Sequence, residues 1–243
     1  MICDGTCGLE DVRAVLFDFD GTLVRQTIDF AAMRAAVLGL AQGYGVEIDG
    51  LARLPALEIV ASVAAGLGRE SARAYRREAA RAIEAIELEA ARLAEPFEGV
   101  PATLAQLAER GFGVGIVTRN CARAVADVLA RHPLTHHVLI TRDDTEHVKP
   151  DPRHLYQAAA QLGVAVERCL MCGDHPMDVA AGRAAGARTA AVIYAEAAIG
   201  RGAFQGLHAP DLLLASVAEL ARRLPDESAR SADAIPSAVE LDG

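Results

Sequence analysis

The sequence contains no tryptophan, and aromatic residues of all kinds make up only 4% of its 243 residues. Proteins that bind single-stranded nucleic acid stack the bases on aromatic side chains, so a wide stacking surface for bases or sugars is not expected. Basic residues are also in the minority, since 24 Lys and Arg stand against 33 Asp and Glu, for a formal net charge of −9. Because a net anion repels phosphate backbones and anionic lipids, we expect neither a nucleic-acid partner nor a membrane partner.

Long uncharged stretches are absent as well. The longest segment without Asp, Glu, Lys or Arg runs only from His154 to Val166, whereas a membrane-spanning helix needs about 20 mostly apolar residues. The N-terminal segment carries Asp4, Glu10 and Asp11, where a secretory signal would place basic residues followed by an apolar run. We therefore expect a cytoplasmic protein.

Cysteines are few, and their number, five, is odd. Cys169 and Cys172 form a C-x-x-C pair, but the pair stands inside the apolar run CLMCGD, which is typical of a strand. No second such pair lies at zinc-ribbon spacing, since three residues separate Cys3 from Cys7. The pattern predicts buried thiols and disfavours a zinc site or a disulfide framework.

Short apolar runs alternate with segments of helical composition along most of the chain. Strands are expected at 13–19, 112–118, 136–141, 168–173, 188–194 and, more briefly, 211–214. Helices are expected at 100–110, 121–131, 152–162, 176–185 and 216–223. Several apolar runs show no polar alternation, which suits parallel strands buried on both faces. The order predicts the α/β class, with a doubly wound parallel sheet and a Rossmann-like core.

The interval 24–95 breaks this alternation, because it is almost wholly helical. Helices are expected there at 28–40, 54–65 and 71–94. So much helix is too long for one crossover, so we predict an inserted all-helical cap domain poised over the C-terminal edge of the sheet. The catalytic core then comprises 1–23 and 96–224. The segment 225–243 is rich in Ser, Asp, Ala and Pro without a period, and we expect a flexible tail there.

Polar residues that follow the expected strands are candidates for a site, since open parallel sheets bind ligands at the C-terminal ends of their strands. The first strand leads into Asp18 and Asp20, and Gly21 and Thr22 then allow a sharp exit with free N–H groups. Carboxylates at i and i+2 of an extended chain point to the same side and repel unless a cation or a shared proton lies between them. A plain D-G turn is the alternative interpretation.

The next two strand ends carry groups suited to an anion. The second strand leads into Thr118, Arg119 and Asn120, and we expect Asn120 to be the N-cap of the following helix. Exposed N–H groups at a helix start bind anions, but capping without further function explains this segment equally well. After the third strand, Lys149 lies on a stiff loop before a helix whose first turn contains Pro152.

The fourth strand end supplies further carboxylates. Asp174 and Asp178 stand four residues apart at a helix start, where acids also suit the helix dipole without any function. Together with the acids of the first strand they predict a site for a hard cation. Several carboxylates with one lysine, one threonine and no histidine cluster favour Mg²⁺ over Zn²⁺. Mg²⁺ and lysine offset phosphate charge while a carboxylate attacks, so the strand ends predict phosphoryl transfer.

These residues resemble a known family. The segments DFDGTLV (18–24), VTRN (117–120), VKPDP (148–152) and GDHPMD (173–178) are similar, in sequence order, to the four motifs of the haloacid dehalogenase superfamily. The helical insertion resembles the C1-type cap of phosphoglycolate phosphatase-like members. The resemblance covers about residues 12–220 of the chain.

The resemblance implies a role for each matched residue. Asp18 would be the nucleophile and Asp20 the general acid and base. Thr118 and Lys149 would bind the phosphoryl group. Asp174 would bind Mg²⁺ beside the Asp18 carboxylate and the Asp20 carbonyl. The remaining expected site residues are Asp178, which would support the site, and the substrate-binding Gly21, Thr22, Arg119 and Asn120.

Departures within the superfamily narrow the expected chemistry. Dehalogenase members lack the second acid of the first motif and phosphonatase members carry Ala there, so the presence of Asp20 favours cleavage of an O–P bond. The Gly173-Asp174 pair resembles phosphatases more than the β-phosphoglucomutase type, which usually begins with Glu-Asp. His175 stands where Ser or Thr is common, and the sequence assigns it no contact.

The resemblance implies a Mg²⁺-dependent phosphatase that acts on a small phosphorylated metabolite through an aspartyl-phosphate, with phosphoglycolate as the family-level substrate. A sugar phosphate, a nucleotide and pyrophosphate stay open as substrates, and the sequence leaves the oligomeric state unknown. A phosphomutase is the alternative enzyme. A non-catalytic binding module is the alternative from another class, and it is disfavoured because every acid and the lysine are present.

A stripe of arginines marks the third helix of the insertion. Arg69, Arg73, Arg77 and Arg81 recur every four residues and share one helix face. A solvated face, or ion pairs to neighbouring helices, is the favoured interpretation. The alternative is that part of the stripe faces the core and attracts an anionic substrate.

Overall fold

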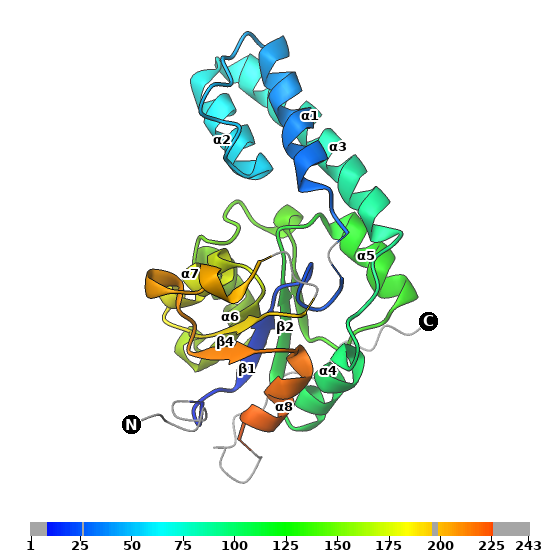
Figure 1. The fold of residues 1–243 in the computed structure, drawn as a ribbon, viewed down its shortest axis with the longest axis vertical. Helices are drawn as coiled ribbons and strands as arrows, with labels where there is room; N and C mark the ends of the chain where they lie inside the picture. The colour runs from blue at the N-terminus through cyan, green and yellow to red at the C-terminus, as the bar shows by residue number, and fades with distance from the viewer. Residues whose placement is uncertain (1–8, 26, 196–198, 226–243) are drawn as a thin grey trace. The chain divides into compact units, whose positions relative to one another are not determined.

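The computed structural model describes residues 9–25, 27–195 and 199–225. The chain divides into two compact units, one formed by Met1–Gln26 with Glu95–Gly243 and the other by Thr27–Ala94 (Figure 1). The expected tail lies, from residue 226 onward, outside the described residues, as do Cys3 and Cys7. Within the described ranges, no helix combines the length and the apolar character needed to cross a membrane.

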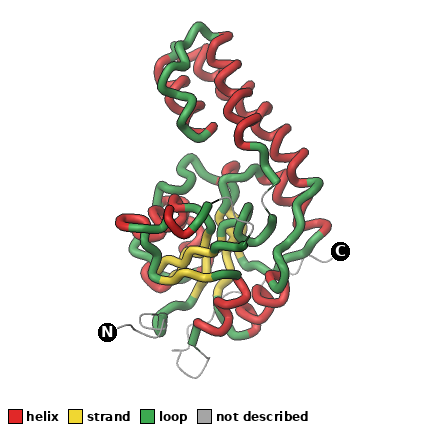
Figure 2. Tube along the Cα trace, in the orientation of Figure 1, coloured by secondary structure: helices red, strands yellow, loops and turns green. Residues whose placement is uncertain are grey.

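The first unit is built on a six-stranded parallel sheet with the strand order β3-β2-β1-β4-β5-β6, which confirms the expected fold class. Figure 2 colours the strands of this sheet yellow. The strands are β1 (Ala14–Phe17), β2 (Gly113–Val117), β3 (Val138–Ile140), β4 (Cys169–Gly173), β5 (Arg188–Val192) and β6 (Leu212–Leu214). All residues of β1, β2 and β4 are buried. Their unbroken apolar runs therefore match strands that are covered on both faces.

Helices cover both faces of this sheet. They are α4 (Val100–Glu109), α5 (Ala122–Arg131), α6 (Arg153–Leu162), α7 (Pro176–Ala185) and α8 (Leu220–Arg223). Helices α6 and α7 contact each other, while α4 contacts α8 (Figure 1). Leu16 of β1, Leu155 of α6 and Met171 of β4 belong to one buried apolar cluster. Short 3-10 turns lie at Arg142–Asp144 (η1), Val166–Arg168 (η2), Arg201–Ala203 (η3), Gly206–His208 (η4) and Val217–Glu219 (η5).

Several helix ends differ from the sequence prediction. Asn120 is not the N-cap of α5, because Cys121 takes that position and the Ala122 N–H is bonded to Asp143 Oδ2 at 2.8 Å. Pro152 is the N-cap of α6 rather than part of its first turn. The terminal helix expected at 216–223 is split into the 3-10 turn η5 and α8.

The second unit consists of three helices that enclose their own core. They are α1 (Phe30–Gly43), α2 (Ala56–Gly66) and α3 (Arg69–Ala91). Val37, Ile59 and Tyr75 are fully buried between them, and the Tyr75 hydroxyl donates to the Val37 carbonyl at 3.1 Å. The expected arginine stripe, made up of Arg69, Arg73, Arg77 and Arg81, is exposed in this unit. These side chains therefore form a solvated face of α3 as the unit stands by itself.

The two chain segments that enter and leave this helical unit pair with each other. Val24 forms an antiparallel bridge with Pro96, and the Arg25 N–H donates to the Glu95 carbonyl at 2.8 Å. The Arg25 guanidinium lies 5.0 Å from the centroid of the Phe97 ring. This pairing joins the two ends of the first unit at the point where the helical segment is inserted between them.

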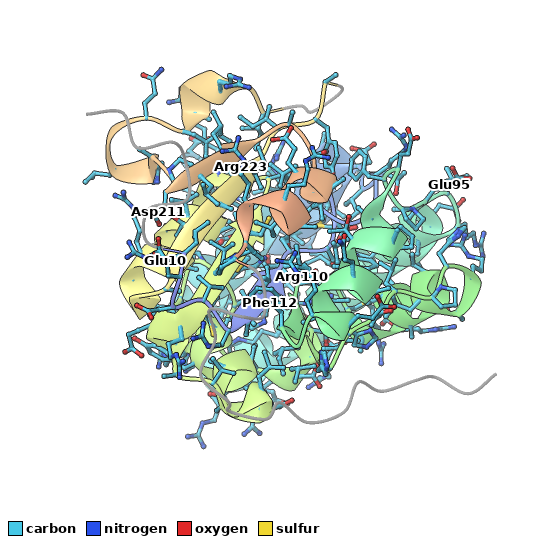
Figure 3. All side chains as sticks on the ribbon, turned by 90° about the horizontal axis from the view of Figure 1, so that it is seen from below. Glu10, Glu95, Arg110, Phe112, Asp211 and Arg223 are labelled. Carbon is cyan, nitrogen blue, oxygen red and sulfur yellow. The ribbon has the colours of Figure 1, made fainter. Side chains whose placement is uncertain are left out.

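Arg110 ties the end of the described chain to the sheet. Its guanidinium donates to the carbonyls of Ala221, Leu224 and Pro225 and lies 5.4 Å from the centroid of the Phe112 ring (Figure 3). One side chain thus satisfies three backbone acceptors, one inside α8 and two directly after it. Removing that side chain leaves them without this donor.

We predict that Arg110→Ala lowers the free energy of unfolding by about 2 kcal/mol, since hydrogen bonds from a charged group contribute roughly 1.5–3 kcal/mol. Urea unfolding followed by circular dichroism measures the change. Arg222→Ala, which removes an exposed arginine of α8, is the control and should change the free energy of unfolding by less than about 0.5 kcal/mol. Equal shifts in both variants would contradict the anchoring role.

Candidate active site

The candidate site lies in the first unit, at the point in the sheet where the order of the strands reverses. The chain adds β2 and β3 on one side of β1 and then β4, β5 and β6 on the other, and such a switch point is where open α/β sheets bind ligands. Asp18 directly follows β1, Thr118 follows β2, and Asp174 follows β4. Lys149 precedes α6. These four loops carry the residues that the sequence assigned to the site, except Asp178, which lies in the first turn of α7.

A buried lysine joins three of these loops. Lys149 Nζ lies 2.6 Å from Asp18 Oδ1 and 2.8 Å from Asp178 Oδ1, and only 1% of the lysine side chain is exposed. The backbone of Lys149 is held as well, since its N–H donates to His154 Nδ1 at 3.2 Å and its carbonyl accepts from Arg119 at 3.0 Å. The ammonium is therefore fixed between two carboxylates that come from distant parts of the chain.

A cluster of carboxylates surrounds this ammonium. Asp18, Asp174 and Asp178 each offer an oxygen, and these atoms all lie within 4.8 Å of one another. Two glycines make the close approach possible. A Cβ atom on Gly21 would stand 2.2 Å from Asp174 Oδ2, and one on Gly173 would stand 2.2 Å from Asp178 Oδ2. Gly21 also has φ +84°, a conformation that other residues rarely adopt.

The charges of this cluster do not balance. Burial raises the pKa of Asp18 to about 6 although Lys149 opposes the shift, and burial together with the Asp18 charge raises the pKa of Asp174 to about 8. Burial by itself lowers the pKa of Lys149, but the charges of Asp178 and Asp18 outweigh it and raise that pKa overall. One ammonium thus faces three carboxylates, and burial disfavours the ionised forms of two of them, Asp18 and Asp174. A hard divalent cation such as Mg²⁺ fits this all-oxygen donor set.

Asp178 has both of its carboxylate oxygens engaged. Oδ1 faces Lys149, and Oδ2 accepts from the His175 N–H at 3.0 Å in a capping box at the start of α7. The sequence assigned Asp178 a supporting role and not a metal-binding one. Asp178 thus contacts Lys149 and caps α7, and its proximity to Asp18 and Asp174 adds a carboxylate to the same cluster.

Asp20 has a different partner from Asp18. Its Oδ2 accepts from Asn120 Nδ2 at 2.9 Å, across one hundred residues of sequence. The carboxylate is not a member of the acidic cluster found among the described residues. The chain turns sharply after it, because the Gly21 N–H donates to the Val24 carbonyl at 2.8 Å. The two acids of the first motif therefore sit in separate hydrogen-bonding environments.

The remaining predicted residues lie around these acids. Thr118 is 1% exposed, and its hydroxyl accepts from the Asn120 N–H at 3.0 Å. Arg119 Nη1 lies 3.1 Å from Met177 Sδ in addition to its bond with the Lys149 carbonyl. Thr22 is fully buried, and its carbonyl accepts from the Tyr194 hydroxyl at 2.9 Å. Thr22 thus sits beneath the turn rather than on its surface.

Two histidines of the site had no role in the sequence prediction. His154 is fully buried and accepts the Lys149 N–H, and burial lowers its pKa to about 3, so the ring is neutral. No sequence signal marks it. His175 is the N-cap of α7, where its Nδ1 accepts from the Met177 N–H at 3.1 Å. Its place directly before Pro176 is a signal for capping.

The raised pKa values predict how stability depends on pH in the absence of metal. The pKa values of Asp18 and Asp174 rise from 3.8 to about 6 and about 8, so their stabilising contribution is complete below pH 3.8 and is lost as the pH rises through 6 and 8. In EDTA, Asp174→Asn should therefore be more stable than the wild type at pH 8.5 and show a smaller difference at pH 5. Urea unfolding at both pH values measures this, and a variant less stable than the wild type at pH 8.5 would contradict it.

Comparisons with known proteins agree with the geometry. Residues 15–192 match the model of the haloacid dehalogenase-like hydrolase family. The chain is 35% identical over 191 residues to the N-acetylmuramic acid 6-phosphate phosphatase of Pseudomonas aeruginosa, covering 75% of this chain and 82% of that protein. It is 38% identical over 136 residues to the pyrophosphatase PpaX of Bacillus cereus, covering 55% of this chain but only 62% of that protein.

The fold is also similar to solved structures. A hydrolase from Pseudomonas syringae superposes with a TM-score of 0.62 at 18% identity, covering 86% of this chain and 96% of that one. At this level of identity the similarity concerns the fold alone. It extends to the Rossmann-like sheet that carries the four loops of the candidate site.

Proposed function

Because the chain belongs to the haloacid dehalogenase-like hydrolase family, we propose that it is a Mg²⁺-dependent phosphatase that cleaves a small phosphomonoester through an aspartyl-phosphate on Asp18. The observation that carries the proposal is the buried ammonium of Lys149, held against Asp18 at 2.6 Å inside a cluster of carboxylates. A phosphoryl group brings negative charge to the nucleophile, and a fixed cation offsets it. One named relative is an N-acetylmuramic acid 6-phosphate phosphatase, which supports the same activity, and the other is a pyrophosphatase, which supports hydrolysis of a phosphate compound more generally.

The first half of the reaction uses the acids of the first motif in different roles. Lys149 holds Asp18 Oδ1, which orients the carboxylate so that its other oxygen attacks phosphorus. The P–O bond to the leaving group breaks as the new bond to Asp18 forms, and Asp20 gives its proton to the leaving oxygen. A divalent cation held by Asp18 and Asp174, with the Asp20 carbonyl, supplies further positive charge beside the phosphoryl group when bound.

The second half of the reaction regenerates the enzyme. The Asp20 carboxylate takes a proton from a water molecule, which attacks the phosphorus of the aspartyl-phosphate. The bond between phosphorus and Asp18 breaks, inorganic phosphate leaves, and Asp20 is protonated again. The Thr118 hydroxyl accepts from the Asn120 N–H and keeps its own O–H to donate to a phosphoryl oxygen throughout.

For the substrate, we propose an amino-sugar or related sugar phosphate ahead of phosphoglycolate. The relative that spans most of this chain is named for N-acetylmuramic acid 6-phosphate, whereas the pyrophosphatase match spans a smaller part of both proteins. A hydrolase, as opposed to a phosphomutase, also fits the Gly173-Asp174 pair at the fourth strand end.

We predict that Asp18→Asn lowers kcat by about 10³-fold or more on any accepted substrate, because the amide cannot attack phosphorus. Phosphate release in Mg²⁺ measures the rate. Asp127→Asn, at an exposed position of α5, is the matched control and should keep the wild-type rate. Wild-type turnover by Asp18→Asn would refute the proposed nucleophile.

Metal removal and a substrate panel test the rest of the proposal. EDTA should abolish phosphate release, and Mg²⁺ should restore it.

Across N-acetylmuramic acid 6-phosphate, glucose 6-phosphate, phosphoglycolate and pyrophosphate, the sugar phosphates should give the highest kcat/KM, and each should release inorganic phosphate without any acceptor sugar. Full activity in metal-free buffer, or phosphoryl transfer only to an added sugar, would overturn the Mg²⁺-dependent hydrolase.

A further inference from the structure

Asn120, next to the site, has hydrogen bonds at its backbone and at both ends of its side-chain amide. Its backbone N–H donates to Thr118 Oγ1 at 3.0 Å, and its carbonyl accepts from the Arg142 N–H at 3.1 Å. Its side-chain Oδ1 accepts from the Cys121 N–H at 2.8 Å, and Nδ2 donates to Asp20 Oδ2 at 2.9 Å. The residue is only 6% exposed. Its backbone and both ends of its amide are therefore held in place.

These partners leave one chemically reasonable orientation for the amide. With Oδ1 on the Cys121 N–H, the amide nitrogen faces the Asp20 carboxylate. The reversed amide would place its oxygen against the carboxylate and its N–H group against a backbone N–H, so both contacts would become repulsive. The donor to Asp20 is thus fixed by the backbone at the start of α5.

Helix capping does not account for this donor. The first N–H of α5, that of Ala122, is already bonded to Asp143 Oδ2, and a cap needs an accepting oxygen rather than an amide N–H. The Asn120 oxygen serves the local backbone, whereas its nitrogen reaches a residue one hundred positions earlier in the chain. Local structure therefore explains the hydrogen bond of the Asn120 oxygen but not that of its nitrogen.

We infer that Asn120 is a positioning residue that holds the general acid and base, Asp20, by its Oδ2, so that Oδ1 exchanges the proton with the leaving group and then with water. The inference rests on the proposed function and gives Asn120 a task other than the substrate contact expected from the sequence. An oxygen that accepts an amide N–H is disfavoured as the site of the acid proton. The proton of the neutral carboxyl then lies on Oδ1, leaves with the alcohol as the P–O bond breaks, and is replaced from the attacking water.

The orientation matters because Asp20 is only half-buried and lies on a sharp turn. A general acid acts only when its proton lies within hydrogen-bonding reach of the leaving oxygen, and small errors in orientation cost large factors in rate. The loss should be greatest for alkyl phosphates, whose alkoxides require a proton. It should be small in the first step with 4-nitrophenyl phosphate, whose phenolate leaves without one.

The test compares Asn120→Ala and Asn120→Asp with the wild type. Asn120→Asp keeps an oxygen for the Cys121 N–H but replaces the donor to Asp20 with an acceptor, so it separates positioning from local folding. For each protein, rapid-quench and stopped-flow measurements give the rate of phosphorylation by a sugar phosphate and by 4-nitrophenyl phosphate. Asp143→Ala, which removes the contact to Ala122 without touching Asp20, is the structural control.

Both Asn120 variants should be phosphorylated about 10²-fold more slowly by the sugar phosphate, with KM changed by less than about threefold. With 4-nitrophenyl phosphate they should release a rapid burst of nitrophenolate at close to the wild-type rate, followed by slow turnover because the water step also needs Asp20. Asp143→Ala should keep wild-type kinetics on both substrates. The leaving-group difference is the signature that a purely structural role would not produce.

Equal losses on both substrates, or a rise in KM as the main effect, would overturn the inference in favour of substrate binding by Asn120. Unchanged kinetics in both variants would overturn it as well. If Asn120→Ala does not fold, Asn120→Asp decides the outcome by the same comparison. A wild-type protein that shows no burst and no phosphatase activity with any substrate would contradict the proposed function itself. A burst from the wild type, with the same rates in both Asn120 variants, would contradict this inference alone.

Discussion

The buried ammonium of Lys149 is the charge on which the arrangement of the site depends. A cation with 1% of its side chain exposed is costly unless anions surround it, and its partners Asp18 and Asp178 come from the ends of β1 and the start of α7. Breaking such a buried set by removing one member leaves uncompensated charge. The same contacts thus gather more carboxylate oxygens than the one ammonium balances, which suits a hard cation. The ammonium itself suits an incoming phosphoryl group.

The two acids of the first motif are separated by their surroundings rather than by their chemistry. Asp18 faces the ammonium of Lys149, which orients it and opposes the effect of burial on its pKa. Asp20 faces the neutral amide of Asn120, outside the acidic cluster. Such different environments for neighbouring carboxyl groups are the usual basis on which one acts as a nucleophile and the other exchanges a proton.

The sequence predicts the sheet closely, because the strands are short apolar runs and the first four of them, β1 to β4, end at or directly before Asp, Thr or Gly. It also brings Asp18, Lys149 and Asp174 to one edge of the sheet, since parallel strands share the direction of their ends. It is wrong about Asn120 as a helix cap, because the partners that decide this position, Asp20 and Asp143, lie elsewhere in the chain. Pairing at such distances in sequence leaves no local pattern, and the same holds for the contact of His154 with Lys149.

The central claim is that Asp18 becomes covalently phosphorylated. The most direct measurement is peptide mass spectrometry of the phosphorylated protein. The protein is mixed with Mg²⁺ and a substrate that it hydrolyses, and the reaction is quenched in acid within milliseconds. The account predicts one phosphoryl group on the peptide that contains Asp18, which disappears when hydroxylamine cleaves acyl phosphates. A phosphoryl group on any other residue, or none at all while substrate is being consumed, would contradict it.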